Sequence, residues 1–233
     1  MTEKTIGIMG GMGPEAGADL FLKIVAATPA KRDQDHLHVI MDSNPKAPSR
    51  VAALLEGGED PTPVLQATAR NLERAGADFL VIACNTAHFF HDRIAQAVRI
   101  PVLHIADETV AEIFRRYPRV QTVGILGSDA TVRLRLYHDR LEAKGLKAIS
   151  PSNADQEIVQ RAIDSVKAGD KGEIVRANVR MVAERLAEQG AELLLTGCTE
   201  LPLVLRDGDV SVPVLDPTEV LAQAAVRLAR ADS

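Results

Sequence analysis

A repeated segment constrains the fold of this chain more than any other feature. The sequence GADFLVIACNT at 76–86 recurs as GAELLLTGCTE at 190–200, an offset of 114 residues that aligns Cys84 with Cys198. Two further matches follow in the same order, 6–10 with 123–127 and 100–103 with 212–215. These ordered matches predict two halves of similar fold, each with one cysteine directly after an apolar strand.

Short apolar runs alternate with longer amphipathic segments, which is the pattern of parallel β-α-β units. We expect strands at 5–9, 37–41, 78–83, 102–103, 120–126, 146–149, 192–195 and 212–215. Eight such strands also suit a (β/α)₈ barrel, so the pattern leaves two architectures open. In both, the carboxyl ends of the strands gather at one edge and form the binding site.

Glycines and capping residues mark the expected helices of the second half. One helix begins at Ser128 or Asp129 and continues to Gly145. Another begins at Asn153 or Asp155 and continues to 169, and a third ends at 190. Glycine ends helices because it adopts the left-handed conformation without steric cost.

Composition excludes several classes of protein. The chain is 46% hydrophobic and 25% charged, as in soluble globular proteins. A net charge of −5 and 3% aromatic residues argue against a nucleic-acid-binding role. The longest apolar runs, such as 79–84, are far shorter than the roughly 20 residues that span a bilayer. The first five residues lack the features of a signal peptide, so we expect a cytoplasmic protein with reduced thiols.

Cys84 and Cys198 allow two interpretations. Free cysteine is among the most buried residue types, so both thiols can be ordinary core residues. Alternatively, a cysteine between a strand and a helix lies in the positive field of the helix N-terminus, which is expected to lower its pKa. Two such thiols can remove a proton from one face of a carbon and deliver one to the other face, as a racemase requires.

Polar residues follow each cysteine. Asn85 and Thr86 come after the first, and Thr199 and Glu200 after the second. As helix-opening residues they would expose backbone N–H groups to a substrate carboxylate. Simple N-capping is the alternative, and the two roles are compatible.

The segment 11–16 matches the dinucleotide-binding pattern G-x-G-x-x-[GA] after a strand. However, Glu15 would compete with a pyrophosphate at the helix N-terminus, and Asp42 comes later than the roughly 20 residues expected of a ribose ligand. We therefore expect Met12 and Gly13 to approach a small ligand closely, or only to make a tight strand-to-helix connection.

Polar and cationic residues lie at the end of the second expected strand and just after it. Ser43 and Asn44 end it, and Lys46 and Arg50 come next, where a cation can bind a substrate carboxylate. An exposed arginine on a polar loop is the alternative. Lys167 lies near a helix C-terminus, which favours a cation on dipole grounds alone.

The histidines predict no metal site. His36 and His38 would share one strand face, and His88 and His91 one helical flank. Neither pair has a third ligand at metal-type spacing, so all four are interpreted as surface or packing residues.

Four motifs together closely resemble the aspartate/glutamate racemase family: IGIMGGMGPEA at 6–16, DSNP at 42–45, ACNTAH at 83–88 and GCTEL at 197–201. The resemblance extends from the first strand to the last helix. It implies an α/β fold of two flavodoxin-like lobes with four-stranded parallel sheets, related by pseudo-twofold symmetry around a shared site. The expected lobes are 1–105 plus 214–233, with the last helix returning to the first lobe, and 106–213.

The resemblance also implies racemisation of a small amino acid, aspartate or glutamate first, without pyridoxal phosphate, metal or nucleotide, in a homodimer. Cys84 and Cys198 match the two acid/base thiols. The expected substrate-binding residues are Met12, Gly13, Ser43, Asn44, Arg50, Asn85, Thr86, Lys167, Thr199 and Glu200. The alternatives are a broad-specificity racemase, a hydantoin racemase, a maleate isomerase or a decarboxylase on this scaffold, and a non-catalytic dicarboxylate-binding protein.

Overall fold

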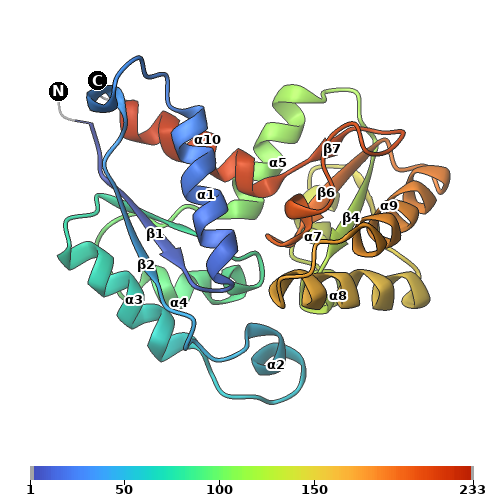
Figure 1. Ribbon diagram of the computed structural model, residues 1–233, viewed down its shortest axis with the longest axis horizontal. Coiled ribbons are helices and arrows are strands. Elements are labelled where there is room, and N and C mark those ends of the chain that lie inside the picture. Colours follow the sequence, from blue (N-terminus) through green and yellow to red (C-terminus); the bar gives the residue numbers. More distant parts are fainter. Residues whose placement is uncertain (1–2, 232–233) are drawn as a thin grey trace. The chain divides into compact units, whose positions relative to one another are not determined.

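The computed structural model describes residues 3–231, which form two compact units (Figure 1). The first unit contains the chain up to Glu108 together with the residues from Thr218 onward, and the second is Thr109–Pro217. These divisions lie three and four residues later than the expected lobe boundaries after 105 and 213. Residues 1–2 and 232–233 of the expected first lobe lie outside the described part of the chain.

The first unit is built on a parallel sheet of three strands in the order β2 (Val39–Ser43), β1 (Ile6–Gly10), β3 (Phe79–Ile82). The expectation of four strands is wrong for this unit, because the segment at 102–103 makes only an isolated bridge to Leu80. The segment bonds to β3 only through Leu80, the carbonyl oxygen of Val102 accepts from the His91 side chain, and a helix begins at Ile105. The chain therefore leaves the sheet before a strand can extend.

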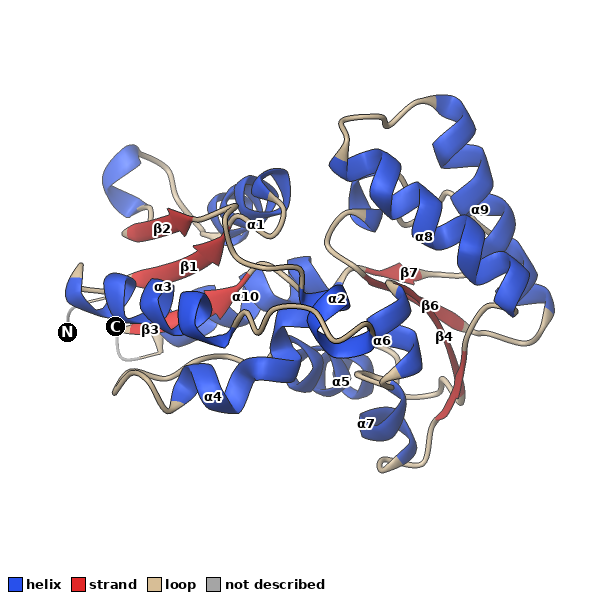
Figure 2. Cartoon of the chain, turned by 90° about the horizontal axis from the view of Figure 1, so that it is seen from below, coloured by secondary structure: helices blue, strands red, loops and turns tan. Residues whose placement is uncertain are grey.

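Helices cover both faces of this sheet. Helices α1 (Pro14–Ala27) and α10 (Pro217–Arg230) pack on one face, and α3 (Thr62–Arg74) and α4 (His91–Ala95) on the other (Figures 1 and 2). Alternate strand residues supply the two cores, with Val81 facing the first pair of helices and Leu80 the second. The helix at the end of the chain thus packs in the first unit.

The second unit has a four-stranded parallel sheet in the order β5 (Lys147–Ile149), β4 (Thr122–Gly127), β6 (Leu193–Gly197), β7 (Val214–Leu215). In each unit the first strand lies between the second and the third, as in flavodoxin-like folds. The long helices α8 (Asn153–Lys167) and α9 (Glu173–Glu188) pack over one face of this sheet (Figure 2). This topology confirms the expected two-lobe α/β fold over the barrel.

The two halves repeat their packing in detail. A Cβ atom on Gly7 would lie 2.5 Å from Cδ2 of Leu80, and one on Gly124 would lie 2.6 Å from Cδ2 of Leu194. Both glycines occupy the first strand of their unit, and both leucines lie on the neighbouring third strand. The internal repeat therefore extends to the close contacts between central strands.

The remaining elements are short, apart from one helix. They are η1 (Asp33–Asp35), α2 (Arg50–Leu55), η2 (Thr86–Phe90), α5 (Ile105–Arg116), α6 (Asp129–Arg133), α7 (His138–Glu142) and η3 (Leu201–Leu203). The helix expected from Ser128 to Gly145 is broken into α6 and α7, because Arg135 adopts a positive φ of 61° between them. Among residues 3–231, none of the helices has the length and apolarity needed to cross a bilayer.

Candidate active site

The first group of predicted site residues lies at the carboxyl ends of the three strands of the first unit. It comprises Met12 and Gly13 after β1, Ser43 and Asn44 at β2, Arg50 at the start of α2, and Cys84, Asn85 and Thr86 after β3. We call it the Cys84 cluster. The sheet order places these strand ends side by side, Met12 and Cys84 share one buried core, and α2 contacts η2. The structure thus brings this set together at one edge.

The glycine-rich turn and Asn44 approach each other closely. Gly11 has a φ of +88°, and a Cβ atom built on it would lie 2.4–2.5 Å from three backbone atoms of Asn44. Gly13 then occupies the N-cap position of α1, and Pro14 lies in its first turn. The turn therefore needs glycine both for its conformation and for its contact with the β2 loop.

Replacing Gly11 with alanine is expected to destabilise the protein more than replacing Gly76 does. Both glycines have a positive φ, +88° and +99°, but nothing lies within 4 Å of a Cβ atom at Gly76. G76A should lose about 1–2 kcal/mol of unfolding free energy from backbone conformation alone. In G11A the new Cβ atom also clashes with the backbone of Asn44. This clash should cost about 1–3 kcal/mol of further unfolding free energy, measured by urea unfolding. Equal losses in the two variants would contradict the close approach.

Cys84 is buried, with 7% of its surface exposed, and continues the buried face of β3 formed by Leu80 and Ile82. The segment that follows it is a five-residue 3₁₀ helix, η2, and not the longer α-helix expected from the sequence. The carbonyl oxygen of Cys84 accepts a hydrogen bond from Nδ1 of His88, at 2.9 Å. A side chain therefore holds the backbone of the cysteine.

His88 is one of three histidine rings that lie together. The ring of His104 lies 4.9 Å from that of His88 and 4.8 Å from that of His91, measured between centroids. Burial, and next the neighbouring His104, hold the pKa of His88 well below its ordinary value of 6.5. The expected strand pair His36 and His38 instead precedes β2, and both side chains are exposed.

Acid is expected to destabilise the protein partly through His88. Because the pKa of His88 is lowered in the folded state, its contribution is complete above about pH 6.5 and is lost as the pH falls below that value. The loss amounts to about 1.4 kcal/mol per pH unit while the native ring stays neutral. Urea unfolding at pH 7.5, 6.5 and 5.5 measures this loss. In H88N, the slope of the unfolding free energy against pH should decrease by about the amount that one bound proton contributes. An unchanged slope in H88N would contradict the assignment.

Arg50 is held by its own loop. Its Nη1 donates to the carbonyl oxygens of Ala47 at 3.1 Å and Pro48 at 2.6 Å, and the hydroxyl of Ser49 caps the helix that Arg50 begins. Its Nε is buried and has no hydrogen-bond partner among the described residues. The Nη1 bonds thus hold the guanidinium in place, and its Nε–H remains as a donor suited to binding an anion.

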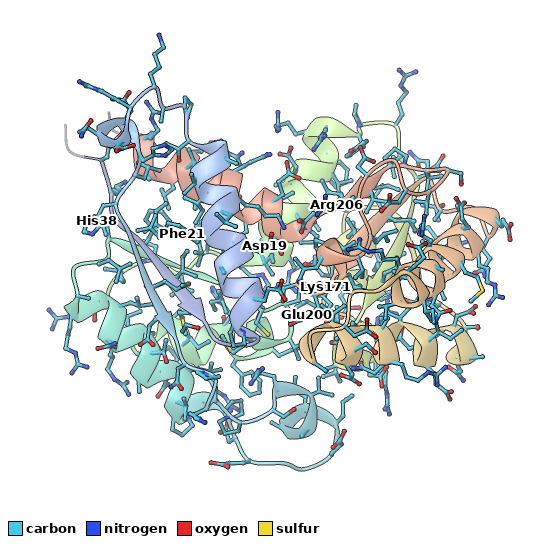
Figure 3. All side chains as sticks on the ribbon, in the orientation of Figure 1. Asp19, Phe21, His38, Lys171, Glu200 and Arg206 are labelled. Atoms are coloured by element: carbon cyan, nitrogen blue, oxygen red, sulfur yellow. The ribbon has the colours of Figure 1, made fainter. Side chains whose placement is uncertain are left out.

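The second group of predicted residues lies in the second unit, and we call it the Cys198 cluster. Cys198 follows β6, and its Sγ donates a hydrogen bond to Oε2 of Glu200 at 3.0 Å. The hydroxyl of Thr199 donates to the same oxygen at 3.3 Å. Glu200, labelled in Figure 3, is only 4% exposed, so this carboxylate is a buried acceptor shared by two neighbours.

The pKa of Cys198 is raised, contrary to the expected lowering by a helix terminus. Burial is the main cause, the charge of Glu200 adds to it, and Lys167 at the end of α8 opposes it. The segment after Cys198 is again a short 3₁₀ helix, η3, which provides little of the field of a long helix. The raised pKa favours the protonated thiol at this cysteine.

Tyr137 is a neighbour of Cys198 that the sequence did not indicate. Its ring is fully buried against Gly197, where a Cβ atom would lie 3.2 Å from Cε2 of the ring. Burial raises the pKa of Tyr137, and a hydrogen bond with Thr109 opposes that shift. An isolated tyrosine in an amphipathic segment carries no sequence signal of such a position.

Comparisons with known proteins agree with this arrangement. The chain is 28% identical over 225 residues to the broad specificity amino-acid racemase RacX of Bacillus subtilis, covering 95% of this chain and 96% of that one. Aspartate racemase of Picrophilus torridus has a similar structure, with a TM-score of 0.88, 30% identity, and coverage of 97% of this chain and 94% of that chain. An aspartate racemase homologue from Pyrococcus horikoshii has a TM-score of 0.78 and 30% identity, with coverage of 97% and 99%.

A family model confirms the resemblance that the motifs suggested. It is the model described as Asp/Glu/Hydantoin racemase, and it matches residues 9–225, nearly the whole chain. The match includes both cysteines and all of the predicted substrate-binding residues. The chain therefore belongs to the Asp/Glu/Hydantoin racemase family.

Proposed function

We propose that this protein is an amino-acid racemase that uses Cys84 and Cys198 as its acid and base. The observation that carries the proposal is the repeated placement of one buried, free cysteine within two residues of the end of the third strand of each unit. Ordinary core cysteines have no reason to recur at the same structural position in both halves. Such a repeat suits two thiols that act on opposite faces of one α-carbon.

The proposed reaction balances with the thiols alone. One cysteine, as thiolate, removes the α-proton and becomes a thiol, while the other thiol donates its proton to the opposite face and becomes a thiolate. Cys198 has the raised pKa and donates to Glu200, so it is suited to begin as the proton donor. Cys84 then begins as the base for one enantiomer, and the roles reverse for the other.

The α-proton of an amino acid is weakly acidic, so the carbanion-like state needs stabilisation. We propose that backbone N–H groups following each cysteine, at Asn85 and Thr86 and at Thr199 and Glu200, bind the α-carboxylate. Preorganised donors of this kind stabilise charge that develops in the transition state. The burial of all four residues supports this role, because charge interactions strengthen away from water.

We propose an acidic amino acid, aspartate or glutamate, as the first substrate to test. The buried Nε of Arg50 and the cation Lys167 beside Cys198 support this choice, since both favour a second carboxylate. Two structural relatives are described as aspartate racemases or homologues of one. The relative RacX, which matches 95% of this chain, is described as broad in specificity, so neutral amino acids belong in the same test.

The deciding experiment incubates the purified protein with single enantiomers of aspartate, glutamate, alanine and lysine in D₂O. Appearance of the opposite enantiomer by chiral chromatography, with deuterium at the α-carbon by mass spectrometry, is the expected result. The double variant C84A/C198A serves as the control for contaminating racemases. Absence of α-deuterium in every amino acid would overturn the proposal and favour the dicarboxylate-binding alternative.

We further propose that the protein works as a homodimer in the cytoplasm. Both cysteines are free thiols, which fits a reducing compartment. Exposed Phe21 and Leu22 on α1 and Met41 on β2 provide apolar surface in the first unit that a second copy can cover. Sedimentation equilibrium of the wild type and of L22K tests the dimer, which the lysine should weaken.

A further inference from the structure

His88 is a buried titratable residue beside the Cys84 cluster that the proposed reaction does not use. Its side chain is 3% exposed, and Nδ1 lies 2.9 Å from the carbonyl oxygen of Cys84. A carbonyl oxygen only accepts, so Nδ1 carries the hydrogen and donates it. The hydrogen bond therefore fixes the tautomer of the ring.

The two neighbouring histidines also make hydrogen bonds to the backbone. Nε2 of His91 lies 2.9 Å from the carbonyl oxygen of Val102, so Nε2 carries its hydrogen. Nδ1 of His104 accepts from the backbone N–H of Ala106 at 3.2 Å. All three rings are thus bound to backbone groups, and of these backbone contacts only that of His88 is to the cysteine.

The internal repeat shows what the His88 bond replaces. At the offset of 114 residues, the counterpart of His88 is Pro202, whose side chain cannot donate a hydrogen bond. In the second unit the backbone N–H of Leu201 donates to the carbonyl oxygen of Cys198 at 3.1 Å. A backbone donor holds one cysteine, and a histidine side chain holds the other.

Stability alone does not account for a histidine at this position. Nε2 of His88 is buried and has no hydrogen-bond partner among the described residues. An unsatisfied buried polar atom costs about 1–3 kcal/mol, which an apolar side chain of similar size would avoid. The compensating feature is the bond to the backbone of Cys84.

We infer that His88 is a positioning residue for Cys84: its neutral ring, through the Nδ1–H bond to the cysteine carbonyl, orients the thiol and the backbone N–H groups that follow it. The inference rests on the proposed use of Cys84 in racemisation. It explains why the 3₁₀ segment after Cys84 contains a buried ring where the segment after Cys198 contains a proline. A small misplacement of a reacting group can reduce catalysis by up to about 100-fold, so this orientation matters.

Three substitutions separate the hydrogen bond from packing. In H88N the amide nitrogen occupies the place of Nδ1 and keeps the donor to Cys84. In H88Q the amide reaches the place of Nε2 and does not, and H88A removes both donor and ring. H91Q is the matched control, since its amide can keep the bond to Val102 and His91 does not bind the Cys84 carbonyl.

The first measurement does not depend on racemisation. Each variant is treated with methyl methanethiosulfonate, and the modification rates of Cys84 and Cys198 are followed separately by peptide mass spectrometry. We expect the Cys84 rate to change several-fold in H88A and H88Q and to return towards wild type in H88N, while the Cys198 rate stays constant throughout. Unchanged Cys84 rates in both H88A and H88Q would overturn the inference.

The second measurement uses the substrate that exchanges its α-proton in D₂O. Loss of one hydrogen bond predicts a fall in kcat of about tenfold in H88A and H88Q, with KM little changed, and recovery in H88N. If H88N is as impaired as H88A, the ring acts by packing and the inference fails. Should H88A not fold, H88N against H88Q decides. A wild type that racemises nothing removes the proposed function, while the modification rates still judge the role of His88.

Discussion

Replacing Cys198 with alanine is expected to lower kcat for racemisation in both directions by about 10²–10⁴-fold, the usual contribution of a general acid or base. The same loss is expected for C84A. Inversion at the α-carbon needs proton removal on one face and delivery on the other, so neither cysteine can complete it alone. Chiral chromatography of the product from each enantiomer measures the loss.

The single variants should differ in proton exchange although both fail to racemise. The remaining cysteine can still remove an α-proton on its own face and return a deuteron from D₂O to that face. One variant is therefore expected to label only the L-enantiomer and the other only the D-enantiomer. Labelling of the same enantiomer by both variants would contradict the two-thiol mechanism. Far-ultraviolet circular dichroism and urea unfolding control for misfolding.

Much of the fold was predictable from the sequence because parallel strands are buried on both faces. Runs such as 79–82 are apolar throughout, and glycines with positive φ follow helices such as α8 and α9, so the strands were placed to within a few residues. The repeat then located both cysteines at strand ends. The exception was the segment at 102–103, where a helix begins too soon for a strand to form.

The electrostatics of the site were less predictable, because they depend on contacts that motifs do not specify. The helix-terminus argument predicted a lowered pKa for Cys198, but burial and the hydrogen-bonded Glu200 raise it. The sequence also gave no sign that Arg50 would turn back onto the carbonyls of its own loop. Side-chain direction decides both cases, and it follows from packing in three dimensions.

For His88, the sequence contains a signal that hydrophobic periodicity does not reveal. It lies four residues after Cys84, a spacing at which side chains often reach the backbone of the preceding turn. The interpretation as a packing residue was correct about its burial but missed its bond to the cysteine carbonyl. Comparing the two halves at this position, histidine against proline, is the signal that points to the difference.

Glu200 and Lys167 are expected to move the pKa of Cys198 in opposite directions. Glu200 raises this pKa through its charge and its hydrogen bond, and Lys167 lowers it. E200Q keeps the size and burial of the side chain but removes the charge, so the pKa of Cys198 should fall. K167M removes the opposing cation, so the pKa should rise. Each unit of change alters the thiolate fraction below the pKa about tenfold.

The pH dependence of Cys198 modification by methyl methanethiosulfonate measures this shift, since the thiolate is the reacting form. The midpoint should move to lower pH in E200Q and to higher pH in K167M, and the double variant should lie between them. Cys84, followed in the same digests, is the internal control. Burial is the largest cause of the raised pKa and is retained in each variant, so the pKa in E200Q should still exceed that of an exposed thiol. A shift of the same sign in E200Q and K167M would contradict the opposing roles of these two charges.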